Sequence, residues 1–513
     1  MAELLLSRRS IVLRSIVIHM AALMKPDRVF DRVREWEGLA RFASSPSSDV
    51  RLGIVSGRRR QGKTFLLDAL AEAVGGFFFT ATDSTEAEAL RGFGEAVASY
   101  AGGGRYAFRD WDEALERLFA VVGDGLVVID EFPYLSKASP SLPSVLQRAL
   151  DPRGSARKSG ARILLCGSAM SVMGNLLSGN APLRGRASME LIVRPLGYLD
   201  AARFWDIDDP RLAVLVHSIV GGTPAYRREF VAGDAPESLA DFDSWVLRTV
   251  LDPQVPLFRE ARYLLAEETE IRDVALYHAV LGAIAGGHTT RGGIANAIGR
   301  SSTDIGHPLS VLDDAQLITR EADPFNRGKS TYRIAEPLIV FYEAIMRREW
   351  TRLERGNTEA AWRNSQATFR SQVVGPHFEG ICREWAMAVD AEVFGELPGQ
   401  VAAATVNDPR DKKQIQVDVA VLAPEETGHP RRILSLGEVK WDRTMTLGHL
   451  ERLERARELL SAKGYDTRNT VLSCYSGAGF DENLRAAGAA PGERAGETDA
   501  PMLVDLDAIY ALE

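Results

Sequence analysis

Eight consecutive residues, GRRRQGKT at Gly57–Thr64, have the types and spacing that hold the phosphates of a nucleotide. They fit the pattern G-x-x-x-x-G-K-[ST] and lie between a strand-like run, LGIVS, and a helical pattern, TFLLDALAEAV. The glycines permit a tight backbone whose N–H groups point at phosphates, and the helix N-terminus adds positive charge. We expect Lys63 to reach the β- and γ-phosphates and the Thr64 hydroxyl to bind Mg²⁺. The predicted binding residues for ATP are Gly57, Arg58, Arg59, Arg60, Gln61, Gly62, Lys63, Thr64 and Phe65.

Two carboxylates end the apolar run GLVVIDEF further along the chain. Downstream of a phosphate-binding loop, Asp130 is expected to hold Mg²⁺, usually through water, and Glu131 to polarise the attacking water. A strand that ends in an acidic turn is common, so this interpretation depends on the upstream motif. An adjacent glutamate implies hydrolysis of ATP rather than binding alone.

Three further residues are candidates for the same chemistry. Ser168 follows the run ARILLC, and the carboxyl ends of parallel strands line one crevice. It either senses the γ-phosphate or caps the following helix. Arg184 and Arg186, in APLRGRAS, either stabilise transition-state charge, from the same or a neighbouring chain, or are solvated loop residues. The predicted catalytic set is Lys63, Glu131, Ser168 and Arg186.

The elements around these residues alternate between short apolar runs and helical stretches over about 51–194, which predicts an α/β fold with a parallel sheet. The expected strands are RLGIVS, GFFFTA, GLVVID, ARILLC and ASMELIV. Residues beyond 196 favour helices. Over 271–336 the sequence predicts three helices and a β-hairpin, LITREAD and STYRIAE, which is the order of a winged helix-turn-helix.

The third of these helices, SSTDIGHPLSVLDDAQ, is expected to begin with serine caps and would be the recognition helix. It carries three aspartates and no lysine or arginine. It therefore either packs against protein or relies on flanking cations to bind DNA phosphates. Those cations are Arg291, Arg300, Arg320, Arg327 and Lys329.

Taken together, these motifs resemble the archaeal-type P-loop ATPases of the AAA+/STAND group. The resemblance spans roughly residues 28–345 and includes VVIDEFPYL, LLCGSAMSVM, PLRGRAS, RPLGYLDAARFW and VGGTPAY. It implies ATP as the nucleotide, a switch or motor role, oligomerisation, and a winged helix after the ATPase. The stretch FDRVREWEGLARF matches the family's opening segment more loosely, through Phe30, Arg32, Glu35 and Leu39.

The C-terminal block resembles the PD-(D/E)xK nuclease-like domains that often follow such ATPases. Its candidate residues are Glu379 in GPHFEGICREW, Asp418 in IQVDVAVLAP, and Glu438 and Lys440 in ILSLGEVKW. Carboxylates with one lysine can hold Mg²⁺ and orient a water against a phosphodiester. Strand periodicity puts Glu438 and Lys440 on one face. Both a nuclease and an inactive scaffold, whose carboxylates and lysine form a surface pair, stay open.

The 513 residues suggest about three domains, and 45% hydrophobic with 26% charged residues is typical of globular proteins. A net charge of -9 excludes a global attraction to nucleic acid, so DNA would need local cations. Near the C-terminal candidates these are Arg410, Lys412, Lys413, Arg431 and Arg432.

The three cysteines match no metal spacing and are expected to be reduced core residues of a cytoplasmic protein. The N-terminal stretch carries Arg8 and Arg9 before a short apolar run, as export signals do, but Arg14 and His19 interrupt that run. We interpret it as a loose extension. No segment is long and apolar enough to predict a membrane span.

The predicted domains are a loose extension (1–26), a P-loop ATPase domain (27–215), a helical lid (216–270), a winged helix (271–345), and a linker with the nuclease-like domain (346–513). The leading hypothesis is hydrolysis of ATP to ADP and phosphate, coupled to the winged helix and to a nuclease-like domain that acts on DNA. The alternative is a slow-turnover nucleotide switch that binds DNA or protein, with an inactive nuclease-like domain. Expected partners are ATP, DNA and a second copy or another protein, and no membrane.

Overall fold

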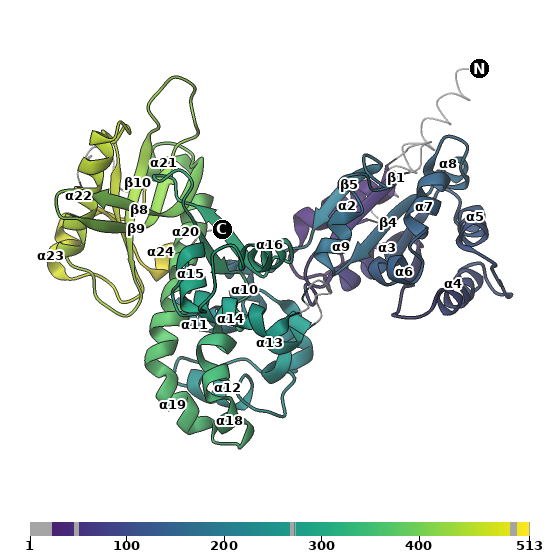
Figure 1. The fold of residues 1–513 in the computed structure, drawn as a ribbon, viewed down its shortest axis with the longest axis horizontal. Helices are drawn as coiled ribbons and strands as arrows, with labels where there is room; N and C mark the ends of the chain where they lie inside the picture. Colours follow the sequence, from purple (N-terminus) through teal and green to yellow (C-terminus); the bar gives the residue numbers. More distant parts are fainter. Residues whose placement is uncertain (1–22, 46–50, 267–270, 272, 493–499, 512–513) are drawn as a thin grey trace, which may run out of the picture. The chain divides into compact units, whose positions relative to one another are not determined.

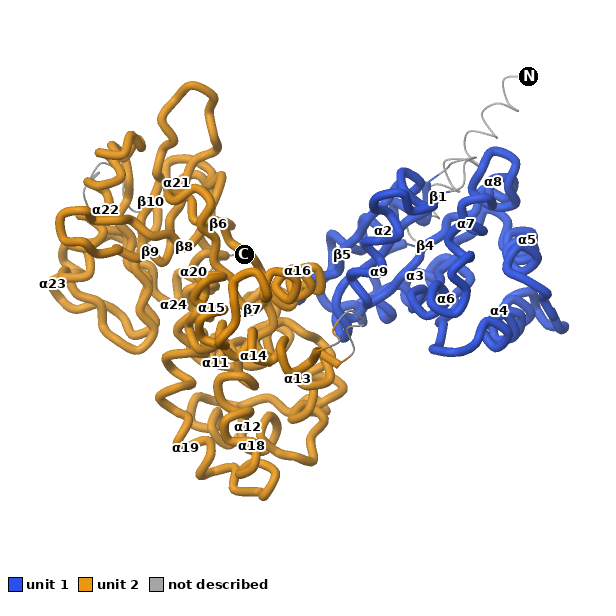
Figure 2. The backbone as a smooth tube through the Cα atoms, viewed as in Figure 1, with its two compact units in different colours: residues 1–195 blue, residues 196–513 orange. Residues whose placement is uncertain are grey.

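The computed structural model describes residues 23–45, 51–266, 271, 273–492 and 500–511. The chain forms two compact units, unit 1 (Met1–Pro195) and unit 2 (Leu196–Glu513), which Figure 2 colours blue and orange. This division falls earlier than the predicted end of the ATPase domain at residue 215, and the finer domain boundaries stay predictions. Most of the predicted extension, residues 1–22, lies outside the described residues.

Unit 1 is built on a five-stranded parallel sheet, so the predicted parallel α/β fold is confirmed (Figure 1). The strand order is β2-β3-β4-β1-β5. All five expected strands are present: β1 (Arg51–Ser56), β2 (Phe77–Thr80), β3 (Leu126–Asp130), β4 (Arg162–Gly167) and β5 (Ala187–Ile192).

Helices cover both faces of this sheet, which explains the continuous apolar runs of its inner strands. Alternate residues of β3 enter different cores: Val127 and Ile129 pack in one, and Leu126 and Val128 in the other. The strand β5, at the edge, alternates between partly buried and exposed residues instead. The helices of unit 1 are α2 (Val33–Ser44), α3 (Lys63–Val74), α4 (Glu86–Tyr100), α5 (Trp111–Val122), α6 (Phe132–Ala138), α7 (Leu142–Leu150), α8 (Ser155–Ser159) and α9 (Met170–Asn175).

Unit 2 begins with helices, and its described residues include three short π-helical segments. Its helical elements up to the C-terminal sheet, apart from the three described next, are α10 (Tyr198–Phe204), α11 (Pro210–Val220), η1 (Tyr226–Phe230), α12 (Phe242–Arg248), α13 (Leu257–Ala266), α17 (Pro337–Phe341), η2 (Tyr342–Met346), α18 (Arg347–Glu354), α19 (Thr358–Thr368), η3 (Phe369–Val374), α20 (Gly375–Ala388) and α21 (Ala391–Phe394).

Three helices and a hairpin follow one another in the predicted order. They are α14 (Val274–Ala285), α15 (Arg291–Ala297), α16 (Gly306–Asp314), β6 (Ile318–Ala322) and β7 (Ser330–Ile334). The expected serine caps of α16 are wrong, because the helix begins at Gly306 after Ile305, which makes no side-chain cap. Ser301 instead bonds Asp304 in the preceding turn.

The C-terminal part of unit 2 is a five-stranded mixed sheet in the order β12-β11-β10-β9-β8. Strands β8, β9 and β10 pair antiparallel, whereas β10, β11 and β12 pair parallel. Helix α20 contacts β8, β9 and β10, and helix α22 packs against β10 and β11. The remaining bounds are β8 (Gln400–Asp408), β9 (Lys413–Leu422), β10 (Ile433–Lys440), α22 (Gly448–Ala462), β11 (Val471–Ser476), α23 (Glu482–Ala487), β12 (Met502–Val504) and α24 (Leu506–Tyr510).

The turn between β6 and β7 is docked on this mixed sheet. Phe325 is buried in the same hydrophobic core as Val406 and Val417. The side chains of Asp323, Asn326 and Lys329 all bond Thr405 of β8. The hairpin turn is therefore part of the C-terminal sheet's packing.

Helix α24 contacts α10, at the start of unit 2, and α20. Tyr198 of α10 donates a hydrogen bond to the Ile509 carbonyl at 3.0 Å, and Trp385 of α20 donates to the Ala508 carbonyl at 3.2 Å. The Tyr198 and Tyr510 rings also pack edge to face.

Cys166, Cys382 and Cys474 are buried and form no disulfide, which confirms the prediction of free core cysteines. Among the described residues, no helix combines the length and apolar character that crossing a bilayer requires.

Candidate functional site

The predicted phosphate loop connects β1 to α3 at the carboxyl end of the parallel sheet. Gly57 has φ 148°, and a Cβ there would lie 2.4 Å from the Val193 carbonyl oxygen, so a side chain at this position would collide with the backbone. Gly62 has φ 81° and precedes the first residue of α3 in a left-handed conformation. Both glycines are therefore required by backbone geometry.

Lys63 lies over this loop with its side chain buried. Its ammonium donates to the carbonyls of Gly57 at 2.8 Å and Arg58 at 2.9 Å. Burial lowers the pKa of Lys63 from its ordinary value, and the nearby carboxylates Glu131 and Asp130 oppose this shift. The loop thus encloses a cation where phosphates would add negative charge.

Thr64 and Asp130 are brought together although they lie 66 residues apart in the chain: the Thr64 hydroxyl donates to Asp130 Oδ2 at 2.7 Å. Asp130 Oδ1 accepts from the backbone N–H of Glu131 at 3.0 Å, which orients the carboxylate. A hydroxyl and a carboxylate are hard oxygen donors, and they suit Mg²⁺ held next to substrate phosphates. The chemistry of this donor pair therefore fits the expected metal.

Glu131 and Ser168 also meet. Glu131 has a left-handed backbone, with φ 52°, immediately before α6. The Ser168 hydroxyl lies 3.2 Å from each oxygen of the Glu131 carboxylate. Ser168 does not cap the following helix, because α9 begins after Ala169 without a side-chain cap, so that alternative is wrong. The serine orients the carboxylate that was expected to act on water.

The other predicted loop residues have different surroundings. Arg58 and Gln61 are buried, Phe65 is exposed, and Arg60 has a left-handed backbone with φ 68°. Arg59 donates to the Tyr134 hydroxyl at 3.0 Å. Sequence reasoning missed Tyr134, although it lies within the quoted VVIDEFPYL motif.

Arg32, from the loosely matching opening segment, contacts the phosphate loop as well. It is buried, donates to the Gln61 carbonyl at 3.4 Å and pairs with Glu35 at 3.0 Å. The sequence singled out both Arg32 and Glu35, but not this contact with the loop.

The structure does not bring Arg186 to the phosphate loop. It precedes β5 at the amino end of the parallel sheet, since Ala187 pairs with Leu52 near the start of β1. Its guanidinium pairs with Asp151 at 2.7 Å. Arg184 donates to the Gly179 carbonyl at 2.6 Å. The structure therefore offers no support for a role of Arg186 within its own chain, and a role toward a neighbouring chain stays a prediction.

The second group of candidates lies in unit 2, where β9, β10 and α20 bring carboxylates together. Gly437 of β10 pairs with Val419 of β9, and Glu438 and Asp418 are the next residues along these two antiparallel strands. Asp418 Oδ2 accepts from the Val439 N–H at 2.9 Å, and Oδ1 accepts from Gln416 at 3.2 Å. Burial, together with Glu438, raises the pKa of Asp418 above its ordinary value.

Glu438 is almost completely buried and accepts from Lys440 at 2.6 Å through Oε1. Arg452 of α22 donates to the same oxygen at 3.3 Å. The buried Oε2 atom accepts no hydrogen bond from the described residues. An oxygen of this kind is expected to have a partner in the working protein.

Glu379 approaches this group from α20. Burial, reinforced by Asp418, raises its pKa to about 7. One turn along the helix, Arg383 lies 3.9 Å from Glu379 and donates to the Asp418 carbonyl at 3.0 Å. Sequence reasoning missed Arg383, although its i+4 spacing from Glu379 was visible, and it missed Arg452, which has no motif around it.

The carboxylates do not yet surround a metal position. In the described ranges, no three His, Cys, Asp or Glu side chains are gathered as a metal site would require. Lys440 and Arg452 instead neutralise one Glu438 oxygen, Oε1. The donor chemistry fits Mg²⁺ or Mn²⁺, and the other oxygen, Oε2, has no hydrogen-bond partner among the described residues and could accept such a cation.

Several cations expected near DNA are engaged by other residues. Arg431 pairs with Glu425, and Arg432 with Glu396 and Glu426. In the hairpin, Lys329 bonds Thr405 and Arg320 bonds Ser330. Arg291 donates to the Ser302 carbonyl. The exposed candidates are Arg291, Arg300, Arg320, Arg327, Arg410, Lys412 and Lys413, of which Arg291 and Arg320 make the hydrogen bonds given above.

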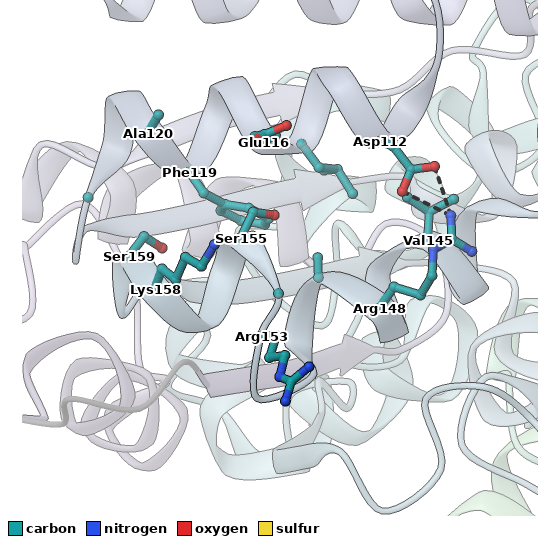
Figure 3. Close-up of a pocket in the computed structure, with 14 residues that line it drawn as sticks. Asp112, Glu116, Phe119, Ala120, Val145, Arg148, Arg153, Ser155, Lys158 and Ser159 are labelled. Carbon is teal, nitrogen blue, oxygen red and sulfur yellow. Dashed lines mark hydrogen bonds and ion pairs between the residues drawn. The ribbon is translucent and has the colours of Figure 1, made fainter.

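A cavity of about 670 Å³ lies between α5, α7 and α8 of unit 1. Figure 3 shows Arg148 paired with Asp112 on one side and Lys158, Ser155 and Ser159 of α8 on the other. The cavity is lined by residues of α5, α7 and α8 and by Arg153 and Gly154 in the segment before α8. It contains none of the predicted site residues.

No family model matches the chain. The curated relatives include an uncharacterized protein of Methanocaldococcus jannaschii, which is 26% identical over 369 residues, covering 71% of this chain and 79% of the relative. Because 369 residues exceed the 195 residues of unit 1, this similarity extends into unit 2.

Solved structures with a similar chain trace include a Walker-type ATPase of Pyrococcus abyssi, with a TM-score of 0.48 and 20% identity, covering 62% of this chain and 97% of that one. The Orc2 protein of Aeropyrum pernix has a TM-score of 0.40 and 14% identity, with 67% and 100% covered. The Orc1 protein of the same organism, solved in complex with DNA, has a TM-score of 0.30 and 15% identity, with 66% and 94% covered.

Proposed function

We propose that unit 1 binds ATP with Mg²⁺ at the phosphate loop and hydrolyses it to ADP and phosphate. The observation that carries this proposal is the 2.7 Å hydrogen bond between the Thr64 hydroxyl and Asp130 Oδ2. It joins the two motifs expected to share one metal ion, and it does so beside the buried Lys63 ammonium. A glycine turn without a ligand would require none of these contacts.

Each residue then has a distinct part. Loop N–H groups and Lys63 neutralise the phosphates, and Thr64 and Asp130 hold Mg²⁺, which supplies charge stabilisation when bound. Glu131 orients and polarises the attacking water, with its carboxylate positioned by Ser168. Lys63 has to leave the carbonyls of Gly57 and Arg58 to reach the substrate, so binding exchanges loop contacts for phosphate contacts.

Two substitutions test this assignment. Lys63→Ala is expected to abolish ATP binding, because backbone amides alone cannot balance the phosphate charge. Glu131→Gln is expected to bind ATP and to stop its turnover, because the amide keeps the shape and loses the charge. Nucleotide affinity by calorimetry and phosphate release measure the two effects, with the exposed Lys158→Ala and Glu116→Gln as matched controls.

Wild-type affinity in Lys63→Ala would remove the phosphate-site assignment. If the wild type binds ATP tightly and releases negligible phosphate with or without DNA, the slow nucleotide switch is the correct function. If Glu131→Gln retains the parental rate of turnover, Glu131 is a turn residue.

We propose a second activity for unit 2, which is metal-dependent cleavage of DNA. The residues of the proposed site are Asp418, Glu438 and Lys440, and Glu379 is a further metal ligand. This activity is supported by the cross-strand placement of the two carboxylates and by the buried Glu438 Oε2 that lacks a hydrogen-bond partner. The carboxylates would hold the metal, and Lys440 would orient water or phosphate. We further propose that α14–α16 with β6 and β7 form a winged helix that joins nucleotide state to this site.

Cleavage of plasmid and linear DNA with Mg²⁺ or Mn²⁺, in the presence and absence of ATP, tests the second activity. Asp418→Ala should eliminate it, while Asp411→Ala, in the exposed β8–β9 turn, should not. A wild type that binds metal but cleaves no DNA would leave a nuclease-like scaffold retained for binding.

A further inference from the structure

Two cationic side chains from different elements meet one buried carboxylate oxygen at the C-terminal site. Lys440 of β10 and Arg452 of α22 both donate to Glu438 Oε1, at 2.6 Å and 3.3 Å. Lys440 belongs to the E-x-K triplet, whereas Arg452 belongs to no recognised motif. The site therefore contains one cation more than its motif requires.

The exposure of Arg452 distinguishes it from a residue that only neutralises Glu438. The Arg452 side chain is 53% exposed, while that of Glu438 is 2% exposed. An arginine recruited to balance a buried carboxylate is expected to pair with it through two parallel hydrogen bonds. Arg452 donates one hydrogen bond to Glu438. A guanidinium has five N–H donors, so most of the donors of this exposed side chain are open to water.

The neighbouring Arg455, on the same helix, pairs with other carboxylates. It donates to both oxygens of Asp408 and to Glu458. Asp408 ends β8, so Arg455 ties α22 to the edge of the sheet. This ion pair helps to place α22 and leaves Arg452 as the α22 arginine that touches the carboxylate group.

We propose that Arg452 is a substrate-positioning residue that binds a phosphate of the DNA backbone at the C-terminal site. The inference rests on the proposed metal-dependent site. A divalent cation at Glu438 Oε2 would share the negative charge that now attracts Arg452, which would weaken the single hydrogen bond to Oε1 and let the exposed guanidinium turn toward a phosphate. Its planar fork matches phosphate oxygens in a way that a lysine does not.

The test uses the full-length protein and two probes. Mn²⁺ alone is titrated by calorimetry, and a fluorescein-labelled DNA duplex is titrated in Ca²⁺ by anisotropy over a range of salt concentrations. Arg452→Ala should weaken DNA binding by about 10-fold and reduce the slope of log Kd against log salt by about 0.9, the value for one phosphate contact. Mn²⁺ affinity should be unchanged or increased, because a cation that competes for Glu438 is gone.

Arg452→Lys should keep the salt slope and recover part of the affinity, and Arg457→Ala, on the same helix, is the control. If Arg452→Ala leaves DNA affinity and the salt slope at wild-type values while Mn²⁺ still binds, the inference is overturned and the metal site stands. If Arg452→Ala weakens Mn²⁺ binding and thermal stability without changing the salt slope, Arg452 is structural. If the wild type binds no Mn²⁺, or Glu438→Gln binds it equally, the metal site itself is overturned.

Discussion

The hydroxyl of Ser168 lies 3.2 Å from both oxygens of Glu131. Of the two roles that the sequence left open, capping α9 is wrong and sensing the γ-phosphate stays a prediction. The contact adds a role toward Glu131, the carboxylate expected to polarise water. A residue that orients Glu131 affects the rate of the chemical step more than the affinity for nucleotide.

Ser168→Ala is therefore expected to lower kcat for ATP hydrolysis by about 10-fold, because Glu131 loses the donor that fixes its orientation. The Kd for ATP should stay within about 2-fold of the wild-type value. Single-turnover hydrolysis and calorimetry measure the two quantities. Ser168→Thr, which retains the hydroxyl, should recover part of the rate, and an equal loss of affinity and rate would favour direct contact with the nucleotide.

At this scale the sequence was most informative where a site is contiguous. Gly57–Thr64 are neighbours in the chain, so residue type and spacing together predict the loop. Asp418 and Glu438 were predicted as site residues because their motif lies on successive strands. Arg452 could not be predicted, because its relation to Glu438 depends on how α22 packs on β10, and nothing in the pattern of α22 marks one arginine among several.

One pair of partly buried histidines, on two helices of unit 2, affects how the unit responds to acid. His217 of α11 and His377 of α20 meet at 2.8 Å through Nδ1 and Nε2. Burial lowers the pKa of His217 to about 4, and burial with neighbouring His217 and Arg333 lowers that of His377. Both folded pKa values lie below the unfolded value, so the unfolded chain binds more protons in mild acid.

The stability contributed by this pair is consequently present above about pH 6.5 and is lost as the pH falls from there toward about 4. His217→Asn, which is polar and does not titrate, should cost about 1 kcal/mol at pH 7.5. The difference in unfolding free energy between His217→Asn and the wild type should be smaller at pH 5 than at pH 7.5. Urea unfolding at the two pH values, with the exposed His429→Asn as control, measures this, and a widening difference would contradict it.

The β6–β7 turn shows how tertiary packing can differ from what the local sequence predicts. Its two strands were predicted around the FNRGK turn, and its cations were candidates for binding DNA phosphates. Docking on β8 depends on Phe325 entering a core formed by residues far along the chain, which no local pattern can reveal. Serine caps for α16 were wrong for a related reason, because Ser301 and Asp304 form their own turn first.

Phe325→Ala should destabilise unit 2 by roughly 3 kcal/mol, since it removes an aromatic side chain from a closed core. The exposed Arg327→Ala in the same turn should leave stability within about 0.5 kcal/mol of the wild type. Denaturant unfolding followed by tryptophan fluorescence measures both. Equal stability of the two variants would show that the turn is not docked in solution.

At the scale of the whole molecule, the parallel sheet and the mixed sheet belong to different compact units with separate cores. The parallel sheet could be predicted from its apolar runs, because strands buried on both faces have a clear signature. The extent of the second unit could not be predicted from the sequence, because its contacts join residues hundreds of positions apart.

Separate cores should give separate thermal transitions. A non-hydrolysable ATP analogue with Mg²⁺, at 100 times its Kd, should stabilise the transition of unit 1 by about 2.7 kcal/mol. Lys63→Ala should eliminate this shift and leave the other transition unchanged. Calorimetric scans with and without the analogue measure it, and one transition that shifts as a whole would contradict independent unfolding of the units.

The contact of α24 with α10 also bears on how the protein is made. Tyr198 and Ile509, joined by a hydrogen bond, are 311 residues apart. A ribosome releases the chain from its N-terminus, so unit 1 is free to fold early. The beginning of unit 2 gains this partner only after the residues of α24, 311 positions further along the chain, have been made. During synthesis the nascent chain therefore passes through a long interval in which α10 and α20 expose the surface that α24 will cover, and chaperones have their best opportunity to bind there.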